Sequence, residues 1–576
     1  MKDQFTGTMF RKALKPCLIS SLGLALADMA DAIVMGQKMG ETGLAAISLS
    51  LPVYMIMSLI LFGFAGGGSI RFARLLGEGE DEAASTSFSM IMETAVCFSL
   101  VMAVAGNLCL APLLRILGTT PADGELYQVS RSYIRIIVSG FPLFFISHSL
   151  NCYLRNDDFQ ELAGAAFVAG NVSDILLSII LVLGLEMGAA GAGYATLAGQ
   201  SVTILLFLWG MGKKEHHLKF AFCVPDFRQV YACFRVGAAT SSQYGFNMLF
   251  FLIANNCLIR IGGERGVAVF DLVQNATYLV VYLYEGIAKA MQPLLSTFVT
   301  EHNHEARKHV LRQSFLWGSG LCMGVMMLLE AAPQLMCRLF GLTDPGTMGL
   351  GMLALRIYGA GVLFGGINIL TENAYQACEK EKPAFVISVL RGAVVLIPVT
   401  LAVSGAGLSV FWLLFPATEV LSLALFHLWK RQFGEQMDSF DDRRVFAVTI
   451  EGDYQNIGGM TDQMESFCEQ WEATAAQRFF CVMAAEEMCL SILEKGFEKK
   501  PGGYIQVTLV ALEEGLFELH IRDNAVSFNP FSLETEKAGE GRAYDMDALG
   551  IYVIKQKAKS FFYRRYQGFN TMVVRI

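Results

Sequence analysis

Long apolar segments alternate with short polar ones through the first 430 residues of the chain. Each apolar segment is long enough to cross a bilayer, which takes about 20 residues of helix. A polar break at 212–229 divides the segments into two sets of six. The pattern therefore predicts an all-α membrane protein of twelve transmembrane helices in two six-helix lobes. The expected spans are about 14–36, 46–72, 88–114, 132–153, 161–184, 188–211, 232–261, 266–300, 313–340, 351–377, 383–404 and 407–429.

The pattern changes after residue 430, where a charged segment leads into a soluble sequence. Two amphipathic helices are expected at about 454–473 and 475–496. Alternation of apolar and polar residues about a turn predicts a hairpin at 504–523, and a second hairpin is expected at 561–576. Helices layered on such a sheet form an α+β domain. The expected domains are an N-terminal lobe at 1–212, an interlobe loop at 213–231, a C-terminal lobe at 232–430, a linker at 431–444 and a soluble domain at 445–576.

The composition agrees with a membrane protein. Hydrophobic residues make up 54% of the chain and charged residues 17%, whereas soluble proteins are about 25% charged. The formal net charge is −8, and the segment from Asp438 onward holds 22 acidic and 15 basic residues, so the membrane part is close to neutral. Neither part has the basic balance of a nucleic-acid binder. The 13 cysteines are scattered, and their spacing predicts neither a metal site nor a disulfide framework.

Lysine and arginine are unevenly distributed among the loops. Positive residues favour the cytoplasmic side, and the richer loops are those on the side of the N-terminus. We therefore expect a multi-pass protein of the plasma membrane with both termini in the cytoplasm. The residues that carry this bias are Arg71, Arg74, Lys213, Lys214, Lys219, Arg307, Lys308, Lys380 and Lys382.

The two halves of the membrane part repeat each other at a constant offset of 223 residues. Gly43 corresponds to Gly266, and Gly63 corresponds to Gly286. Twin bundles in one chain are typical of transporters, whose substrate and ion sites lie near mid-membrane or between the halves.

Carboxylates interrupt several of the apolar segments. Asp28 and Asp31 are about one helical turn apart in the first span and face the same way. A charged group in the membrane interior is costly, and such residues usually face a cavity or an ion path. We expect Asp31 to be functional, whereas Asp28 has the simpler alternative of a hydrogen bond to a neighbouring helix.

Motifs along the membrane part resemble those of the multidrug and toxic compound extrusion (MATE) transporters. They are Pro16, DAIVMG at 31–36, GAGYAT at 191–196, GIAKAMQP at 286–293, LRGAVVLIP at 390–398 and GLSVFWLLFPATE at 407–419. Their order covers about residues 10–430. The resemblance implies two V-shaped lobes with alternating access, and an antiporter that exports small, amphipathic organic substrates against an inward flow of Na⁺ or H⁺.

The same resemblance assigns roles to residues of the first lobe. Asp31 occupies the position of the family's cation-binding carboxylate, and Thr196 matches the threonine of the sixth span. In the fifth span the family has Asn and then Asp, whereas this chain has Asp174 and Ser178. The lobe thus keeps two carboxylates, but one of them is moved by a helical turn relative to the family pattern. The coupling ion can therefore be either Na⁺ or H⁺.

The second lobe has candidates of its own. Asp271, Glu285 and Glu372 each lie inside an apolar span, which favours a role in substrate or cation binding. The structural alternative is a hydrogen bond between helices or the wall of a water-filled cavity. Arg391 and Glu419 are placed near span ends, where snorkelling or a pair between the lobes is expected.

The soluble domain resembles the nucleotide-binding module of bacterial anti-sigma-factor kinases, in the GHKL ATPase class, over about 445–576. The likeness rests on AAEEMCLSILEKGF at 484–497, RDNAVSFNP at 522–530 and DALGIYVIKQKA at 547–558. It implies a Bergerat-like α+β fold in which Glu487 lies on a helix of the nucleotide site and Asp523 faces the adenine.

The nucleotide motifs of this domain depart from the family pattern. Ser491 replaces the asparagine that binds Mg²⁺, and a hydroxyl is a weaker and shorter ligand. Ala525 and Ala548 replace glycines, so that only Gly550 remains of the second motif. Glycine lets the backbone approach phosphates closely, and alanine obstructs this. We therefore expect a degenerate site without catalytic residues or metal, with ATP binding in doubt.

The function expected from the sequence is a cation-coupled exporter with a cytoplasmic regulatory domain, rather than an enzyme. One alternative is a flippase for lipid-linked precursors, which would need a cationic cavity. Another is a membrane-anchored serine/threonine kinase-like sensor, which the altered motifs disfavour. The sequence contains no Walker A motif, which an ATP-driven pump would need. The expected partners are a small-molecule substrate, the lipid bilayer and a cytoplasmic regulatory protein, without nucleic acid and without a required cofactor.

Overall fold

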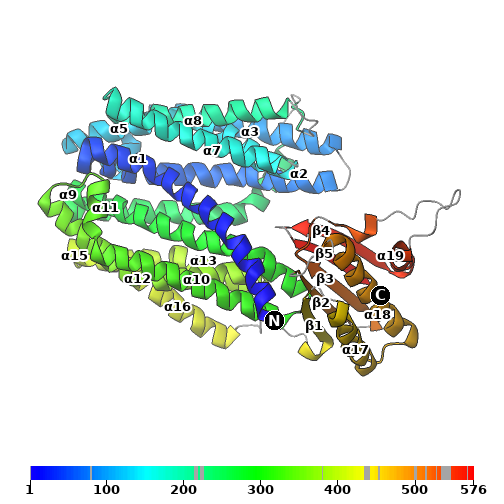
Figure 1. The fold of residues 1–576 in the computed structure, drawn as a ribbon. Helices are drawn as coiled ribbons and strands as arrows, with labels where there is room; N and C mark the ends of the chain where they lie inside the picture. Colours follow the sequence, from blue (N-terminus) through cyan, green and yellow to red (C-terminus); the bar gives the residue numbers. More distant parts are fainter. Residues whose placement is uncertain are drawn as a thin grey trace.

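A bundle of long helices carries a smaller soluble domain against one end (Figure 1). The side chains of Asp28, Arg74 and Ala548 lie outside the described part of the chain. The computed structural model describes residues 2–77, 81–157, 159–212, 218–220, 226–378, 380–433, 441–451, 454–497, 503–512, 515–526, 528–532, 546–566 and 569–576.

The first half of the membrane part is helical almost throughout, as its apolar, leucine- and alanine-rich sequence predicts. Two π-helical turns, η1 (Phe62–Gly66) and η3 (Ile179–Gly184), continue helices of this half. The helices are α1 (Lys2–Leu61), α2 (Gly67–Gly77), α3 (Asp81–Leu108), α4 (Leu110–Leu117), α5 (Glu125–Ser139), α6 (Phe141–Asn156), α7 (Gln160–Ser178) and α8 (Gly188–Met211).

The second half repeats this architecture. Its π-helical turn η4 (Leu390–Val394) lies between two helices that together match one predicted span. The helices are α9 (Phe227–Thr300), α10 (His304–Ala331), α11 (Pro333–Leu339), α12 (Pro345–Ala377), α13 (Glu381–Val389), α14 (Leu396–Ser404), α15 (Leu408–Phe411) and α16 (Leu414–Phe433). Helix α9 begins inside the predicted interlobe loop, four residues before its expected end.

The predicted count of twelve spans stays a prediction. Among the described residues, nine helices are long and apolar enough to cross a membrane, or ten if the bent pair Glu125–Ser139 and Phe141–Leu154 forms one span. Two of the helices are far longer than a bilayer requires, since α1 has 60 residues and α9 has 74. A straight helix of 74 residues would measure about 110 Å, against a hydrocarbon core of about 30 Å.

One glycine interrupts each of these two long helices. Gly40 has φ 57° inside α1, and Gly263 has φ 59° inside α9. A residue with a side chain adopts such a backbone only at a cost, so glycine is the residue that permits the break. The two glycines are separated by the 223 residues of the sequence repeat, and each falls between two predicted spans.

The repeat also relates two points of close helix contact. A Cβ on Gly63 would lie 2.4 Å from the ring of Phe234, on the first part of α9. A Cβ on Gly286, its repeat partner, would lie 3.2 Å from the carbonyl oxygen of Cys17, on the first part of α1. Each half therefore packs against the first helix of the other half, which joins the lobes through two equivalent crossings.

The soluble domain contains the two hairpins and the two helices that the sequence predicted, together with a fifth strand and a further helix. Its antiparallel sheet has the order β1-β2-β3-β5-β4, and one face of the sheet packs on the helices through Ile505, Val507, Leu519, Ile521 and Met572. The other face is turned toward the membrane bundle (Figure 1). The elements are β1 (Val445–Glu451), α17 (Tyr454–Gln470), α18 (Ala475–Ser491), η6 (Ile492–Gly496), β2 (Tyr504–Ala511), β3 (Phe517–Asp523), α19 (Met546–Lys557), β4 (Ser560–Tyr566) and β5 (Phe569–Arg575).

Candidate functional site

Three helices of the first lobe bring predicted polar residues together around Asp31. Ser178 at the end of α7 donates a hydrogen bond of 2.8 Å to Oδ1 of Asp31, and Thr196 of α8 donates one of 3.3 Å to Oδ2. Thr196 also donates to the carbonyl oxygen of Ala192 over 3.1 Å, so that hydroxyl is shared between two acceptors. Direct hydrogen bonds thus connect Asp31, Ser178 and Thr196, three of the four residues that the sequence assigned to this lobe.

Asp174 lies one helical turn before Ser178, on the same side of α7. Its Oδ1 is buried and has no hydrogen-bond partner in the part of the chain that the structure describes. Buried polar atoms are normally satisfied, and an exception calls for an explanation such as a missing ion or water. The carboxylate and hydroxyl oxygens here are ligands that suit a hard cation, and the carboxylates are also groups that accept a proton. We call Asp31, Asp174, Ser178 and Thr196 the N-lobe cluster.

A second polar cluster lies in the other lobe and centres on Arg391 in the π-helical turn η4. Its guanidinium forms a two-pronged bond with Glu419, with distances of 2.9 Å from Nε and 2.8 Å from Nη2. Glu372 lies 3.6 Å from Nη1, and Asn368 donates to Glu419 over 2.6 Å. These groups are the C-lobe cluster, and the paired geometry is the strong form of a charged hydrogen bond.

The position of Arg391 and Glu419 corrects the sequence-based interpretation. Snorkelling and a pair between the lobes are both wrong, because the two side chains are only 19% and 21% exposed and bind each other inside one lobe. The helix that carries Arg391 begins at Glu381, and ten residues of helix span about 15 Å, close to mid-membrane. Counting residues from the start of that helix would have placed Arg391 close to mid-membrane rather than near the end of a span.

A cavity of about 500 Å³ opens beside the C-lobe cluster. Glu285 and Lys289 line it one turn apart, with 3.7 Å between Oε2 and Nζ. Aromatic side chains form part of its wall. Its lining includes Gln243, Asn247, Phe250, Phe251, Gln274, Tyr278, Glu285, Lys289, Gln292, Glu372, Asn373, Arg391, Phe415 and Glu419.

Among the described residues, Asp271 does not line this cavity. Its side chain is 1% exposed and accepts a hydrogen bond of 3.0 Å from Asn275 one turn later on α9. Of the three acids predicted for the second lobe, Glu285 and Glu372 line the cavity, whereas Asp271 is held within its own helix.

The membrane part also matches a known family. A model of the MatE family matches residues 16–180 and 242–424, more than half of the chain. The chain belongs to the MatE family. This confirms the resemblance that the motifs predicted. Together with its long apolar helices, it makes the chain a multi-pass membrane protein.

Two curated relatives of this MatE chain are named for drug export. It is 22% identical over 443 residues to "Probable multidrug resistance protein YoeA" of Bacillus subtilis (strain 168), which covers 73% of this chain and 93% of the relative. It is 24% identical over 423 residues to "Multidrug export protein MepA" of Staphylococcus haemolyticus (strain JCSC1435), which covers 71% and 90%.

Solved MATE structures share the fold of the membrane part. An inward-facing multidrug resistance MATE family transporter superposes with a TM-score of 0.62 at 22% identity, covering 72% of this chain and 97% of that one. The MATE multidrug transporter DinF-BH, solved in complex with a ligand, gives a TM-score of 0.56 at 27% identity, covering 74% and 95%.

The soluble domain of the MatE chain brings together the residues of the altered nucleotide motifs. Oδ1 of Asp523 accepts hydrogen bonds of 2.8 Å from both the backbone N–H of Ala525 and the side chain of Asn570. Asp523 is 1% exposed, and these bonds tie the end of β3 to the following turn and to β5. The carboxylate therefore has a structural role in the fold.

Two further residues of this site lie on α18. The hydroxyl of Ser491 is buried and has no hydrogen-bond partner among the described residues. A Cβ on Gly550 would lie 2.2 Å from Oε2 of Glu487, so glycine is required for α19 to pass that carboxylate. A model of the histidine kinase-like ATPase domain matches residues 450–576, which confirms the second resemblance.

Proposed function

We propose that this MatE chain is a cation-coupled antiporter, driven by Na⁺ or H⁺, whose coupling site is the N-lobe cluster. The supporting observation is the carboxylate of Asp31, which accepts hydrogen bonds from Ser178 and Thr196 in the membrane interior. Asp174, one helical turn before Ser178 on α7, adds a second carboxylate to this site. A site with two acids and two hydroxyls gains a cation or proton at little structural cost, because neutralising the acids removes their mutual repulsion.

The exported substrates are small, amphipathic organic cations. The cavity beside the C-lobe cluster has three carboxylates, on Glu285, Glu372 and Glu419, against two cationic side chains, on Lys289 and Arg391. Its aromatic residues offer faces that attract organic cations. This lining favours a cationic substrate over the anionic head group of a lipid-linked precursor. The names of the curated relatives, which refer to multidrug export, agree with this class.

The test is dye export from proteoliposomes that contain the purified chain. Ethidium is a suitable probe, because it is a small, flat aromatic cation whose fluorescence can be followed. Imposed Na⁺ and pH gradients, applied separately, identify the coupling ion. The variant Asp31→Asn should abolish gradient-driven export while the protein stays folded, and Glu125→Gln, an exposed acid on α5, serves as the control. Unchanged export by Asp31→Asn would contradict the assignment.

The soluble domain is proposed to regulate the transporter through protein contact rather than to transfer phosphate. Three residues support this: Ser491 stands where a Mg²⁺ ligand belongs, Ala525 replaces a glycine, and Asp523 is engaged by Ala525 and Asn570. The soluble domain would act by contacting either the membrane part of the chain or a cytoplasmic regulatory protein. Calorimetry of the full chain in detergent with ATP, with and without Mg²⁺, tests this. Tight, Mg²⁺-dependent binding with phosphate transfer would contradict it.

Both termini are proposed to face the cytoplasm, which the Lys and Arg bias of the loops supports. An epitope tag placed after Ile576 should be reached by antibody only in permeabilised cells. A tag reached in intact cells would reverse the orientation and would place the soluble domain outside.

A further inference from the structure

The outer face of the soluble domain's sheet is polar, whereas its inner face is apolar. On β3, Leu519 and Ile521 point to the inner core, and the alternate residues His520 and Arg522 point outward. Yet His520 and Arg522 are only 6% and 4% exposed. A charged face that is removed from water needs a partner, and the membrane part of the same chain provides it.

The first contact is an ion pair between Arg522 and Glu301, which follows the last residue of α9. Arg522 donates to Oε1 of Glu301, and the two side chains are 4% and 2% exposed. The guanidinium also donates to Gln506 over 3.1 Å and lies 5.0 Å from the ring centre of Phe298. Breaking one side of such a buried pair is costly, because the other charge is left without compensation.

The second contact is aromatic and involves the start of α1. Phe5 is fully buried, with its ring centre 5.7 Å from that of Tyr504 and 5.9 Å from that of Phe569. The ammonium of Lys12 lies 5.0 Å from the centre of the Phe569 ring. The sheet therefore holds the first turns of α1 and the end of α9 at the same time.

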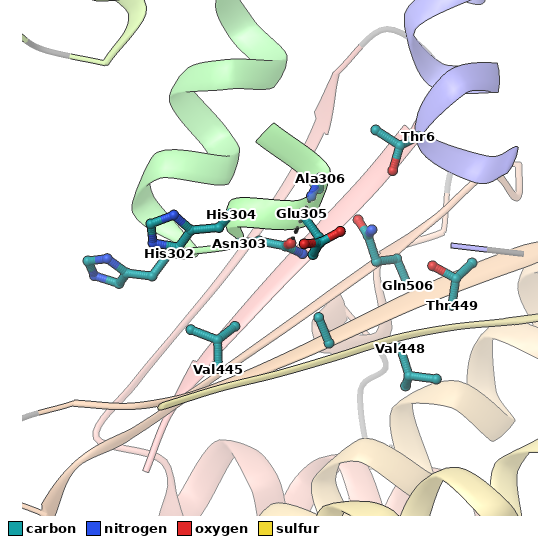
Figure 2. A pocket seen from close by; sticks show the side chains of 11 residues that line it. Thr6, His302, Asn303, His304, Glu305, Ala306, Val445, Val448, Thr449 and Gln506 are labelled. Carbon is teal, nitrogen blue, oxygen red and sulfur yellow. Dashed lines mark hydrogen bonds between the residues drawn. The ribbon is translucent and has the colours of Figure 1, made fainter. Parts of the chain in front are cut away.

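Two cavities flank these contacts. One of about 210 Å³ lies among Thr6, the start of α10 and strands β1 and β2 (Figure 2). The other, of about 710 Å³, lies between the segment from Pro293 to Glu301 and strands β3, β4 and β5. An interface with voids on both sides rests on a few strong contacts rather than on continuous packing, which suits contacts that form and separate.

Helix α1 links this interface to the N-lobe cluster. Its first turns pack on the second lobe, where a Cβ on Gly7 would lie 3.3 Å from His309 of α10. The same helix carries Asp31, about 36 Å beyond Gly7 if it is regular. Since Asp31 bonds to α7 and α8 of the first lobe, α1 joins one lobe at its start and the other at its middle.

We propose that the outer sheet face is a docking surface for the start of α1, and that docking restrains export by holding α1 against the second lobe. This rests on the proposed function, since it requires α1 to move during the transport cycle. Release of the Glu301–Arg522 pair and of the Phe5 contact would free the helix. The occupant of the surface is this chain's own α1 with the end of α9.

A reversible crosslink tests the proposal. In the full chain, Phe5→Cys and Phe569→Cys are combined and treated with a short bis-methanethiosulfonate reagent, and the joined peptides are identified by mass spectrometry. The single variants, treated in the same way, control for the 13 native cysteines. We expect ethidium export to fall by about tenfold on crosslinking, within the usual range of allosteric coupling, and to recover with a reductant.

Charge reversal supplies a second variant that does not depend on thiols. Glu301→Arg and Arg522→Glu should each raise export several-fold by undocking the sheet, and the double variant should return it toward the native rate. A crosslink that forms fully without changing export would overturn the proposal, as would failure of positions 5 and 569 to crosslink. If the native chain exports no ethidium at all, the proposed function fails instead, and the crosslink yield still reports on docking.

Discussion

Ser178 donates a hydrogen bond of 2.8 Å to Asp31, and this bond ties α7 to α1 in the interior of the first lobe. Ser178 directly precedes the π-helical turn η3, and π-turns often occur at functional sites because they redirect side chains. Arg391 lies within the π-turn η4 of the second lobe. Both polar clusters are thus built at an irregular turn of a membrane helix.

Ser178→Ala should weaken cation coupling without stopping export. The substitution removes one oxygen from the N-lobe cluster and leaves Asp31, Asp174 and Thr196 in place. We expect the concentration of coupling cation for half-maximal export to rise about tenfold, with the maximal rate nearly unchanged, as for the loss of a supporting ligand. Ser132→Ala, on the exposed side of α5, is the control. An unchanged cation dependence would remove Ser178 from the site.

Glu419→Gln should strongly destabilise the second lobe. The change leaves Arg391 without its two-pronged partner and keeps only Glu372 at 3.6 Å. We expect a loss of about 2–4 kcal/mol, at or below the usual cost of breaking a buried pair, because the side chains are about one-fifth exposed. Thermal unfolding in detergent measures it. Glu330→Gln breaks the half-exposed pair with Arg356, and its cost should stay within about 1 kcal/mol.

Asp523→Ala should destabilise the soluble domain in the absence of any nucleotide. The backbone N–H of Ala525 and the amide of Asn570 would lose their buried acceptor, at a cost of about 1–3 kcal/mol. Hydrogen exchange of β3 and β5 in the full chain reports the change, with the exposed Asp462→Ala as control. Equal exchange in the variant and the native chain would show that Asp523 is free for a ligand.

Acid should weaken the soluble domain through Glu518. The imidazole of His520, with Nε2 3.0 Å from Oε1, and the hydrogen bond from Arg575 together lower the pKa of Glu518 to about 2. Because the folded pKa lies below the ordinary value of 4.5, the ionised carboxylate stabilises the fold above pH 4.5. This contribution is lost as the pH falls from there through 2. Glu518→Gln should therefore flatten the pH dependence of thermal unfolding in this range, and an unaltered profile would contradict the prediction.

Gly40→Ala and Gly263→Ala should each destabilise the membrane part. Both glycines combine a positive φ with a strongly negative ψ inside a long helix, a backbone region where a side chain costs about 1–3 kcal/mol. Gly320→Ala is the matched control, because this exposed helical glycine has open space around its Cα. That change should be neutral or stabilising by about 0.5–1 kcal/mol. Equal thermal stability of Gly40→Ala and Gly320→Ala would show that the break is not required.

The family motifs and the order of the predicted helices were enough to predict which polar residues of the first lobe lie close together. Asp31, Ser178 and Thr196 came together because a repeated helical bundle fixes which faces meet. The pair of Arg391 and Glu419 was missed, because side-chain pairing between two helices depends on their relative rotation, which one sequence does not encode locally.

The same limit applies to the soluble domain. The sequence predicted the two hairpins of its sheet. It did not predict that Arg522 meets Glu301, 221 residues away, because an exposed polar face and a docked polar face have the same pattern. That face is buried only because the membrane part of the chain packs against the soluble domain.

The repeat gives α1 and α9 equivalent starting turns, but the soluble domain covers those of α1. Phe5 is fully buried, whereas Phe227 and Tyr231 at the start of α9 are 80% and 68% exposed. Near that second position, Arg71 instead donates a 3.0 Å hydrogen bond to Gln229. A duplicated architecture would make the two half-cycles of transport mechanically alike. Packing of one soluble domain on the starting turns of α1 removes that equality, because the equivalent turns of α9 stay exposed.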